Sequence, residues 1–157
     1  MKTLRFAFAA LLGLFLLTSC DFYPVTLTIY AEDSQGHDIL DPTSPYFVGY
    51  DELYLYYDNV QYDVILPKGE EAVSTKVYAP QMFGLQLRKS DAGWYLYFGE
   101  LDGAKDHNDA FALHWPDDSL DWIHYRRFLL MGIVDETWKL NGKRTSMPMT
   151  IVKTKAK

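Results

Sequence analysis

The chain has 157 residues and a formal net charge of −6, and 16% of its residues are aromatic. This length fits a single domain. The aromatic share excludes a disordered chain, because disordered segments are poor in aromatic residues. The acidic balance argues against nucleic acid as a partner, since phosphate binding needs a patch of lysine and arginine.

The first 19 residues have the pattern of a secretory signal. Lys2 and Arg5 supply a positive start, and the apolar run 6–17 follows directly. A membrane-spanning helix needs about 20 apolar residues, so this run is too short to span and has the length of a signal segment. We therefore expect residues 1–19 to be a signal peptide.

The signal ends at Leu17-Thr18-Ser19-Cys20, which contains the only cysteine of the chain. This tetrapeptide resembles the lipobox of bacterial lipoproteins. The resemblance implies that diacylglycerol is attached to the Cys20 thiol, that the signal is cut just before Cys20, and that residues 20–157 form one lipid-anchored domain. Palmitate is among the acyl chains that such an anchor implies. An ordinary secretory signal followed by a buried cysteine is the alternative.

Without the signal, the chain would carry a net charge of −8, because Lys2 and Arg5 are removed with it. Such acidity keeps a tethered domain off an anionic membrane surface. We expect a bacterial cell-envelope location, in the outer membrane or at the cell surface rather than in the inner membrane. Asp21 occupies a sorting-type position, whose meaning differs between bacterial groups.

Strand signals dominate after residue 20, beginning with the alternating segment 25–31. A polar loop over 32–45 follows. Segment 52–66 then predicts a hairpin, because Asp58-Asn59 can adopt the positive φ angles of a two-residue turn. This turn would place six apolar residues on the core face in three cross-strand pairs, Tyr57 with Val60, Leu55 with Tyr62, and Leu53 with Val64.

The second half of the chain continues in the same way. Further strands are expected over 70–79, 83–89, 93–101 and 110–115. Trp94, Leu96 and Phe98 alternate onto one face, as do Phe111, Leu113 and Trp115. The apolar run 128–134 has the length of a buried strand, and Asn141-Gly142 predicts a terminal hairpin.

Eight to ten short strands, with turns every 8–12 residues, predict an all-β fold. We expect an antiparallel β-sandwich, immunoglobulin-like or jelly-roll-like, with a β-barrel as the alternative.

Residues that could carry chemistry are few. The four histidines do not have the close spacings of a zinc site, and the acidic segment 102–109 lacks the calcium-loop pattern. No nucleophile elbow or phosphate loop is present. We therefore predict no metal, no cofactor and no catalytic residue. The cluster Asp117, Asp118 and Asp121 near two tryptophans leaves a glycan hydrolase open as an alternative.

Aromatic residues on strand faces outside the expected core are the strongest functional hint. Such side chains could form a flat platform for a glycan or an envelope protein. The candidate platform residues are Tyr54, Tyr56, Tyr95, Tyr97, Trp115 and Trp122.

The aromatic β segments and the lipobox together resemble small envelope lipoproteins of Bacteroidota, a resemblance that implies no activity. We expect a lipid-anchored binding or structural module rather than an enzyme. Its partners would be a membrane, through the lipid on Cys20, and a glycan or an envelope protein. A small glycan hydrolase and an accessory subunit of an envelope complex are the two alternatives.

Overall fold

The computed structural model describes residues 25–67, 84–130 and 133–154. Cys20 and the strand expected over 70–79 lie outside these residues. The regular elements within the described ranges are ten strands and no helix. The first five are β1 (Val25–Asp33), β2 (Tyr54–Tyr57), β3 (Val60–Ile65), β4 (Leu85–Ser90) and β5 (Gly93–Leu101). The others are β6 (His107–His114), β7 (Leu120–Leu130), β8 (Ile133–Leu140), β9 (Lys143–Thr145) and β10 (Met149–Lys153).

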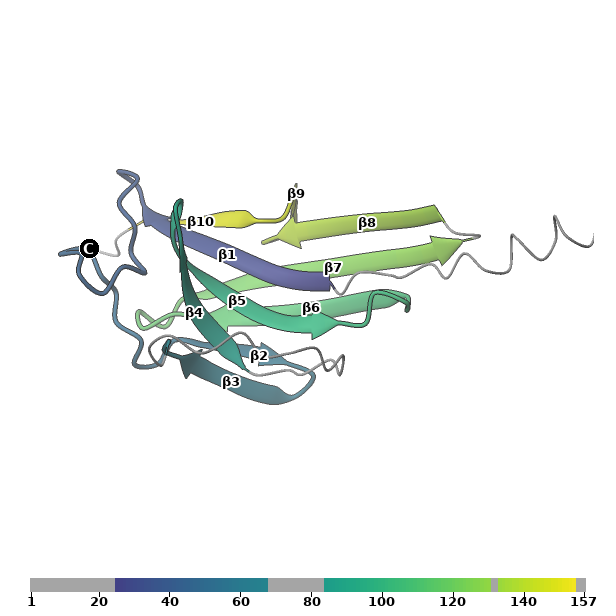
Figure 1. The fold of residues 1–157 in the computed structure, drawn as a ribbon, viewed down its shortest axis with the longest axis horizontal. Helices are drawn as coiled ribbons and strands as arrows, with labels where there is room; N and C mark the ends of the chain where they lie inside the picture. Colours follow the sequence, from purple (N-terminus) through teal and green to yellow (C-terminus); the bar gives the residue numbers. More distant parts are fainter. Residues whose placement is uncertain (1–24, 68–83, 131–132, 155–157) are drawn as a thin grey trace, which may run out of the picture.

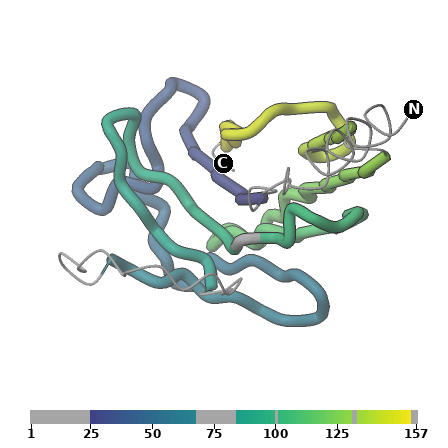
Figure 2. The backbone as a smooth tube through the Cα atoms, turned by 45° about the vertical axis from the view of Figure 1, so that its right-hand side comes forward, coloured from purple at the N-terminus to yellow at the C-terminus, as the bar shows by residue number. Residues whose placement is uncertain are grey.

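The ten strands form one sheet in the order β10-β1-β5-β4-β3-β2-β6-β7-β8-β9. The sheet curls into a nearly closed barrel (Figures 1 and 2). Its two edge strands, β9 and β10, are joined by residues 146–148 alone, so this short connection brings the open edges close to each other. The all-β prediction is confirmed, and of the two architectures that the sequence left open the structure has the barrel.

The sheet is mixed rather than fully antiparallel, because β10 pairs with β1 in parallel and β3 pairs with β4 in parallel. A parallel pair needs a connection of a dozen or more residues. Residues 66–84 give β3 and β4 such a connection, and β1 and β10 come from opposite ends of the chain.

Local turn chemistry sets the hairpins as expected. Asp58 and Asn59 have φ angles of 47° and 61°, and the β2–β3 register pairs Tyr57 with Val60 and Leu55 with Tyr62. Asn141-Gly142, also at positive φ, joins β8 to β9. Glycine and asparagine tolerate this left-handed backbone at low steric cost, which explains their place at these turns.

The barrel interior is filled by alternate side chains of nearly every strand. The largest buried side chains are Trp115, Tyr125, Phe98 and Phe111, together with leucines and Ile29. Trp94, Leu96 and Phe98 share the core face as predicted, with Trp94 only partly buried at its margin. Val60 does not join the core, because it follows the β2–β3 turn at the barrel rim and is 48% exposed.

The prediction that the run 128–134 forms a buried strand is wrong. The run 128–134 lies at the far ends of β7 and β8, where Phe128, Leu130, Ile133 and Val134 are all exposed. Residues 131 and 132 lie outside the described ranges. The apolar run is therefore the end of a hairpin that extends past its neighbouring strand, and no core covers it.

Candidate ligand pocket

A pocket of about 350 Å³ opens at one end of the barrel, which we call the pocket end. This end carries the ends of β1 and β10, the β6–β7 turn and the long β1–β2 connection (Figure 1). The volume lies at the small end of the range for ligand pockets. The lining residues are mostly apolar or aromatic, with three charges among them: Asp33, Ile39, Pro45, Tyr46, Phe47, Val48, Trp115, Pro116, Asp117, Lys153 and Thr154.

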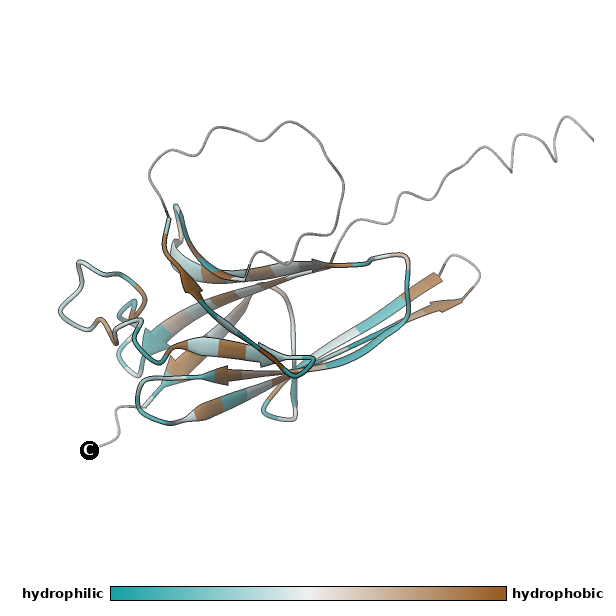
Figure 3. Ribbon diagram, turned by 90° about the horizontal axis from the view of Figure 1, so that it is seen from below, coloured by the Kyte–Doolittle hydropathy of each residue, from teal (hydrophilic) through white to brown (hydrophobic). Residues whose placement is uncertain are grey.

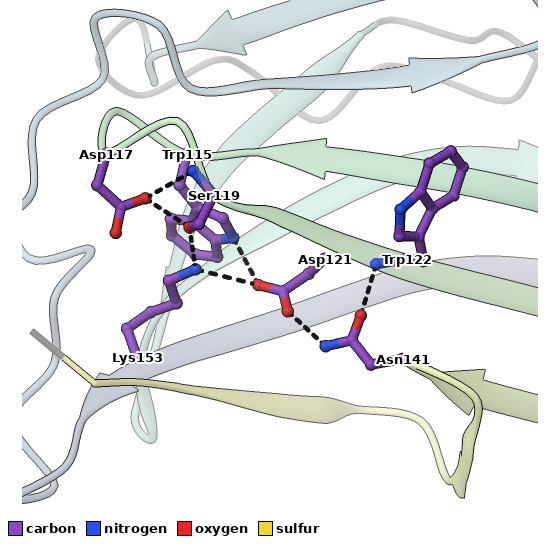
Figure 4. Close-up of polar contacts among 7 residues, drawn as sticks. All are labelled: Trp115, Asp117, Ser119, Asp121, Trp122, Asn141 and Lys153. Atoms are coloured by element: carbon purple, nitrogen blue, oxygen red, sulfur yellow. Dashed lines mark hydrogen bonds and ion pairs between the residues drawn. The ribbon is translucent and has the colours of Figure 1, made fainter. Parts of the chain in front are cut away.

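The β6–β7 turn gives one wall of the pocket. Trp115 and Ser119 close the turn through a backbone hydrogen bond of 3.0 Å, and Asp118 has a φ angle of 62° within it. The Ser119 hydroxyl donates to Asp117 Oδ1 at 2.5 Å and accepts from Lys153 Nζ. The hydroxyl therefore links the turn to the last strand (Figure 4).

Asp121 lies behind this wall and is only 7% exposed. Its carboxylate accepts hydrogen bonds from Trp115 Nε1 at 2.7 Å and Asn141 Nδ2 at 2.6 Å, and Lys153 Nζ lies 3.4 Å away (Figure 4). A buried carboxylate is tolerated only with such partners. Asn141 also accepts from the Trp122 backbone N–H at 2.9 Å. The network therefore fastens the β6–β7 turn, β7, the β8–β9 turn and β10 together.

Asp33 is the second acid of the pocket. The backbone N–H and the imidazole of His37 both contact its carboxylate, at 3.0 and 2.9 Å, and lower its pKa to about 2. The Ser119 hydroxyl likewise holds the pKa of Asp117 below its usual value. Both carboxylates are therefore ionised at neutral pH, and they act as hydrogen-bond acceptors rather than proton donors.

The pocket also presents aromatic faces. Tyr46 stacks on His37 with the ring centroids 3.8 Å apart and the planes 6° from parallel, and the Tyr46 residue remains 38% exposed. Trp115 contributes a buried ring under the Lys153 ammonium, which lies 4.9 Å from its centroid. The pocket thus combines the exposed aromatic face of Tyr46, two anionic acceptors and one cationic donor.

The six predicted platform residues do not lie together. Tyr54, Tyr56 and Trp122 share an outward face, because the register places Tyr56, Ala112 and Trp122 side by side on β2, β6 and β7. Tyr56 and Trp122 are 44% and 48% exposed. Tyr54 stacks on His114 at 4.5 Å in the neighbouring row. These residues form what we call the outer aromatic face.

Tyr95 and Tyr97 lie elsewhere, on β5, which β4 and β3 separate from β2. Tyr95 packs against Tyr30 at 5.4 Å, and the Arg88 guanidinium covers the Tyr97 ring at 3.6 Å. Trp115 points inward and is 1% exposed. One continuous platform of the six residues is therefore not formed, although Trp115 does line the pocket.

His107 lies away from the pocket and has partners of its own. His107 contacts Asp109 through Nδ1 and the Asp102 carbonyl through Nε2, both at 2.7 Å. Within the described residues no group of three or more His, Cys, Asp or Glu side chains could hold a metal ion. In that same part of the chain no helix is long and apolar enough to cross a bilayer.

Comparison of the chain with protein-family models, with curated proteins and with solved structures gives no match. The barrel and the pocket therefore define the protein only as a small all-β domain with a ligand-sized opening at its pocket end.

The pocket was missed in the sequence because five of its eleven lining residues come from the loop 34–53, whose residues have no strand periodicity. The one available signal was Asp33 followed four residues later by His37, flanking a glycine at positive φ. This spacing closes a tight loop at the end of β1, and Tyr46 stacks on the His37 ring of that loop.

Proposed function

We propose that this protein is a lipid-anchored cell-envelope module that binds a small glycan in the pocket at the end of its barrel. The pocket carries the proposal, because it offers the three contacts that sugars use. Tyr46 supplies an aromatic face, the ionised Asp33 and Asp117 accept hydrogen bonds from hydroxyl groups, and Lys153 adds a donor.

Binding is favoured over glycan hydrolysis by the charge state of the pocket. A glycosidase needs one carboxylic acid with a raised pKa to protonate the leaving oxygen. Asp33 and Asp117 have lowered pKa values instead. Asp121 is occupied by Trp115, Asn141 and Lys153.

Ser119 and Lys153 also do not form an activated nucleophile. The Ser119 hydroxyl gives its hydrogen to Asp117, and the Lys153 ammonium is paired with Asp121. A serine nucleophile needs a base that takes its proton, and the Asp117 carboxylate, whose pKa is lowered, is a weak one.

Assembly through strand addition, which would suit an accessory subunit, has less support. The edge strand β9 has three residues, two of which are Lys143 and Arg144. The other edge strand, β10, has five residues and follows Pro148. Short, charged edges with a nearby proline disfavour pairing with another chain.

The anchor in this proposal comes from the lipobox at Cys20. A single acyl chain holds a protein to a membrane only weakly, whereas two or more hold it stably. We expect the chain to incorporate a clickable palmitate analogue in the bacterial cell, and Cys20→Ala to abolish that incorporation. Labelling that persists in Cys20→Ala would contradict the anchor.

The binding site is tested by substitution at the pocket mouth. The lipoprotein, purified in mild detergent, is screened on a glycan array, and the affinity for the best ligand is measured by calorimetry. We expect Tyr46→Ala to weaken binding about tenfold or more, since it removes one exposed aromatic contact. Tyr56→Ala, on the outer aromatic face, should leave the affinity unchanged.

Two results would contradict this site. No glycan binding by the wild type would remove the proposed ligand class. A loss of affinity in Tyr56→Ala, with Tyr46→Ala unaffected, would move the site from the pocket to the outer aromatic face.

A further inference from the structure

The β7–β8 hairpin extends past the rest of the sheet at the end opposite the pocket. The last pair between β6 and β7 joins His107 to Arg127. Beyond it, residues 128–130 pair only with β8, as in the pair Leu130 with Ile133. We call the apolar end of this ribbon, Phe128–Leu130 with Ile133 and Val134, the hairpin tip.

The hairpin tip is apolar on both faces. Phe128, Leu130 and Ile133 share the outward face, and they are 44%, 56% and 70% exposed. Leu129 and Val134 pair on the other face, where the core no longer reaches. Figure 3 shows this hydrophobic colouring at the free ends of β7 and β8. A soluble monomer rarely gathers so many large apolar side chains at one exposed place.

The first described residue of the chain lies toward the same end of the barrel. Val25, at the start of β1, pairs with Leu101 at the end of β5. The connection from β5 to β6 then reaches the tip, where Asp106 accepts a hydrogen bond from the Leu129 backbone N–H at 2.7 Å. In Figure 1, the start of β1 and the projecting ends of β7 and β8 lie toward the same side of the barrel.

The length of chain before Val25 limits where a lipid on Cys20 can lie. Five residues, Cys20 to Pro24, can span at most about 18 Å however they are arranged. β1 alone, with nine residues, runs about 30 Å from Val25 to the pocket end. A bilayer holding that lipid therefore lies near the hairpin tip and away from the pocket.

Charge around the tip does not favour attraction to anionic lipid. Asp106, Asp135 and Glu136 lie beside it, against Arg126 and the Arg127–Glu136 pair at 3.3 Å. A basic excess is what draws a protein to an anionic surface, and none is present at these positions. The affinity of the tip for lipid must therefore come from its apolar side chains.

We propose that the hairpin tip inserts into the interfacial region of the same bilayer that holds the Cys20 lipid. This inference rests on the proposed anchor. Apolar side chains of this kind bury about 5–10 Å into the boundary between headgroups and acyl chains. Two attachments, one covalent and one through the tip, hold the barrel in one orientation with its pocket directed away from the membrane.

The test uses the lipidated full protein in zwitterionic lipid vesicles. Because Cys20 is the only cysteine and its sulfur is acylated, Ile133→Cys supplies the one free thiol, which takes an environment-sensitive NBD fluorophore. We expect blue-shifted emission that is quenched by nitroxide groups on the lipid chains and is insensitive to salt. Gln35→Cys, exposed in the β1–β2 loop, is the matched control, and its NBD emission should be that of a probe in water.

A second variant removes the insertion without touching the core. Leu130→Thr combined with Ile133→Thr keeps strand-forming residues at two exposed positions. We expect the lipid mass to stay unchanged in this variant, while the lipoprotein transfers several-fold faster between vesicles.

The possible failures are distinguishable. Absence of the lipid mass from the wild type, together with NBD labelling of Cys20, overturns the anchor and with it this inference. A lipidated protein whose residue-133 probe reports water overturns the insertion alone. A shielded probe that lipid nitroxides do not quench, in a protein that sediments as a dimer, assigns the tip to a second copy instead.

Discussion

The two ends of the barrel differ in which side chains they bury and which they expose, although both are built from strands of one sheet. At the pocket end, polar side chains are drawn inward, and Asp121 is held by partners from the β6–β7 turn, β10 and the β8–β9 turn. At the hairpin end, apolar side chains are left outside, with Ile133 70% exposed. Buried polar groups need partners within the protein, whereas exposed apolar groups need something outside it. The pocket end is thus held together by contacts within the protein, whereas the hairpin end exposes apolar side chains to its surroundings.

The largest expected effect on stability comes from removing the Asp121 network at the pocket end. Asp121→Ala leaves Trp115 Nε1 and the Lys153 ammonium without their shared acceptor. We expect the free energy of unfolding to fall by about 3 kcal/mol, since removing one partner of a buried charge pair leaves the other uncompensated. Denaturant unfolding measures the loss.

The matched control for Asp121→Ala is Asp51→Ala, at an exposed aspartate of the same end. Its effect should stay within about 0.5 kcal/mol, as for most surface substitutions. Equal midpoints for the two variants would show that the Asp121 network contributes no stability.

The pocket end should also respond to acid. The pKa of Asp33 is lowered from 3.8 to about 2 in the folded protein, so its ionised form stabilises the fold above pH 4. That contribution is lost as the pH falls from about 4 to 2. We expect Asp33→Asn to lower the stability at neutral pH and to flatten the loss over this window.

The titration of Asp33 itself gives the direct check. The carboxyl carbon of Asp33 should titrate with a midpoint near 2 in an NMR series on the full chain. A midpoint near 4 would mean that His37 does not hold this carboxylate in solution.

The smallest expected effect on stability lies at the hairpin tip. Leu130→Thr with Ile133→Thr should change the free energy of unfolding by less than about 0.5 kcal/mol per site, because both side chains are already in contact with solvent. Leu96→Ala, at a fully buried leucine of β5, should cost about 2–5 kcal/mol. A large loss from the tip variant would show that these side chains are covered by protein.

Much of the fold was predictable because its signals are local. Asn141-Gly142 and Asp58-Asn59 specify turns through their own backbone preferences, and they fixed the hairpins that they join. The alternation of Leu96 and Phe98 placed the core face of β5 correctly. The barrel closure and the parallel pairs depend on strands far apart in the chain, and no local pattern records them.

The candidate site was less predictable, and two residues show why. Trp115 alternates with Phe111 and Leu113, and the structure follows that alternation by burying it, so it joins no outward platform. Phe128, like the rest of its run, has the composition of a core strand. Composition does not reveal whether a strand has a neighbour along its whole length. β6 begins at His107, opposite Arg127, so Phe128 has no partner on β6.

The position of β1 within the sheet has a mechanical consequence. β1 lies between β10 and β5 and is hydrogen-bonded to both. A pull on Val25 along the strand axis therefore loads two ladders in shear, the β5 ladder over Val25–Ile29 and the β10 ladder over Ile29–Asp33. A strand at the edge of the sheet would be held by a single ladder under the same load. β1 thus begins at a point where the barrel can carry force.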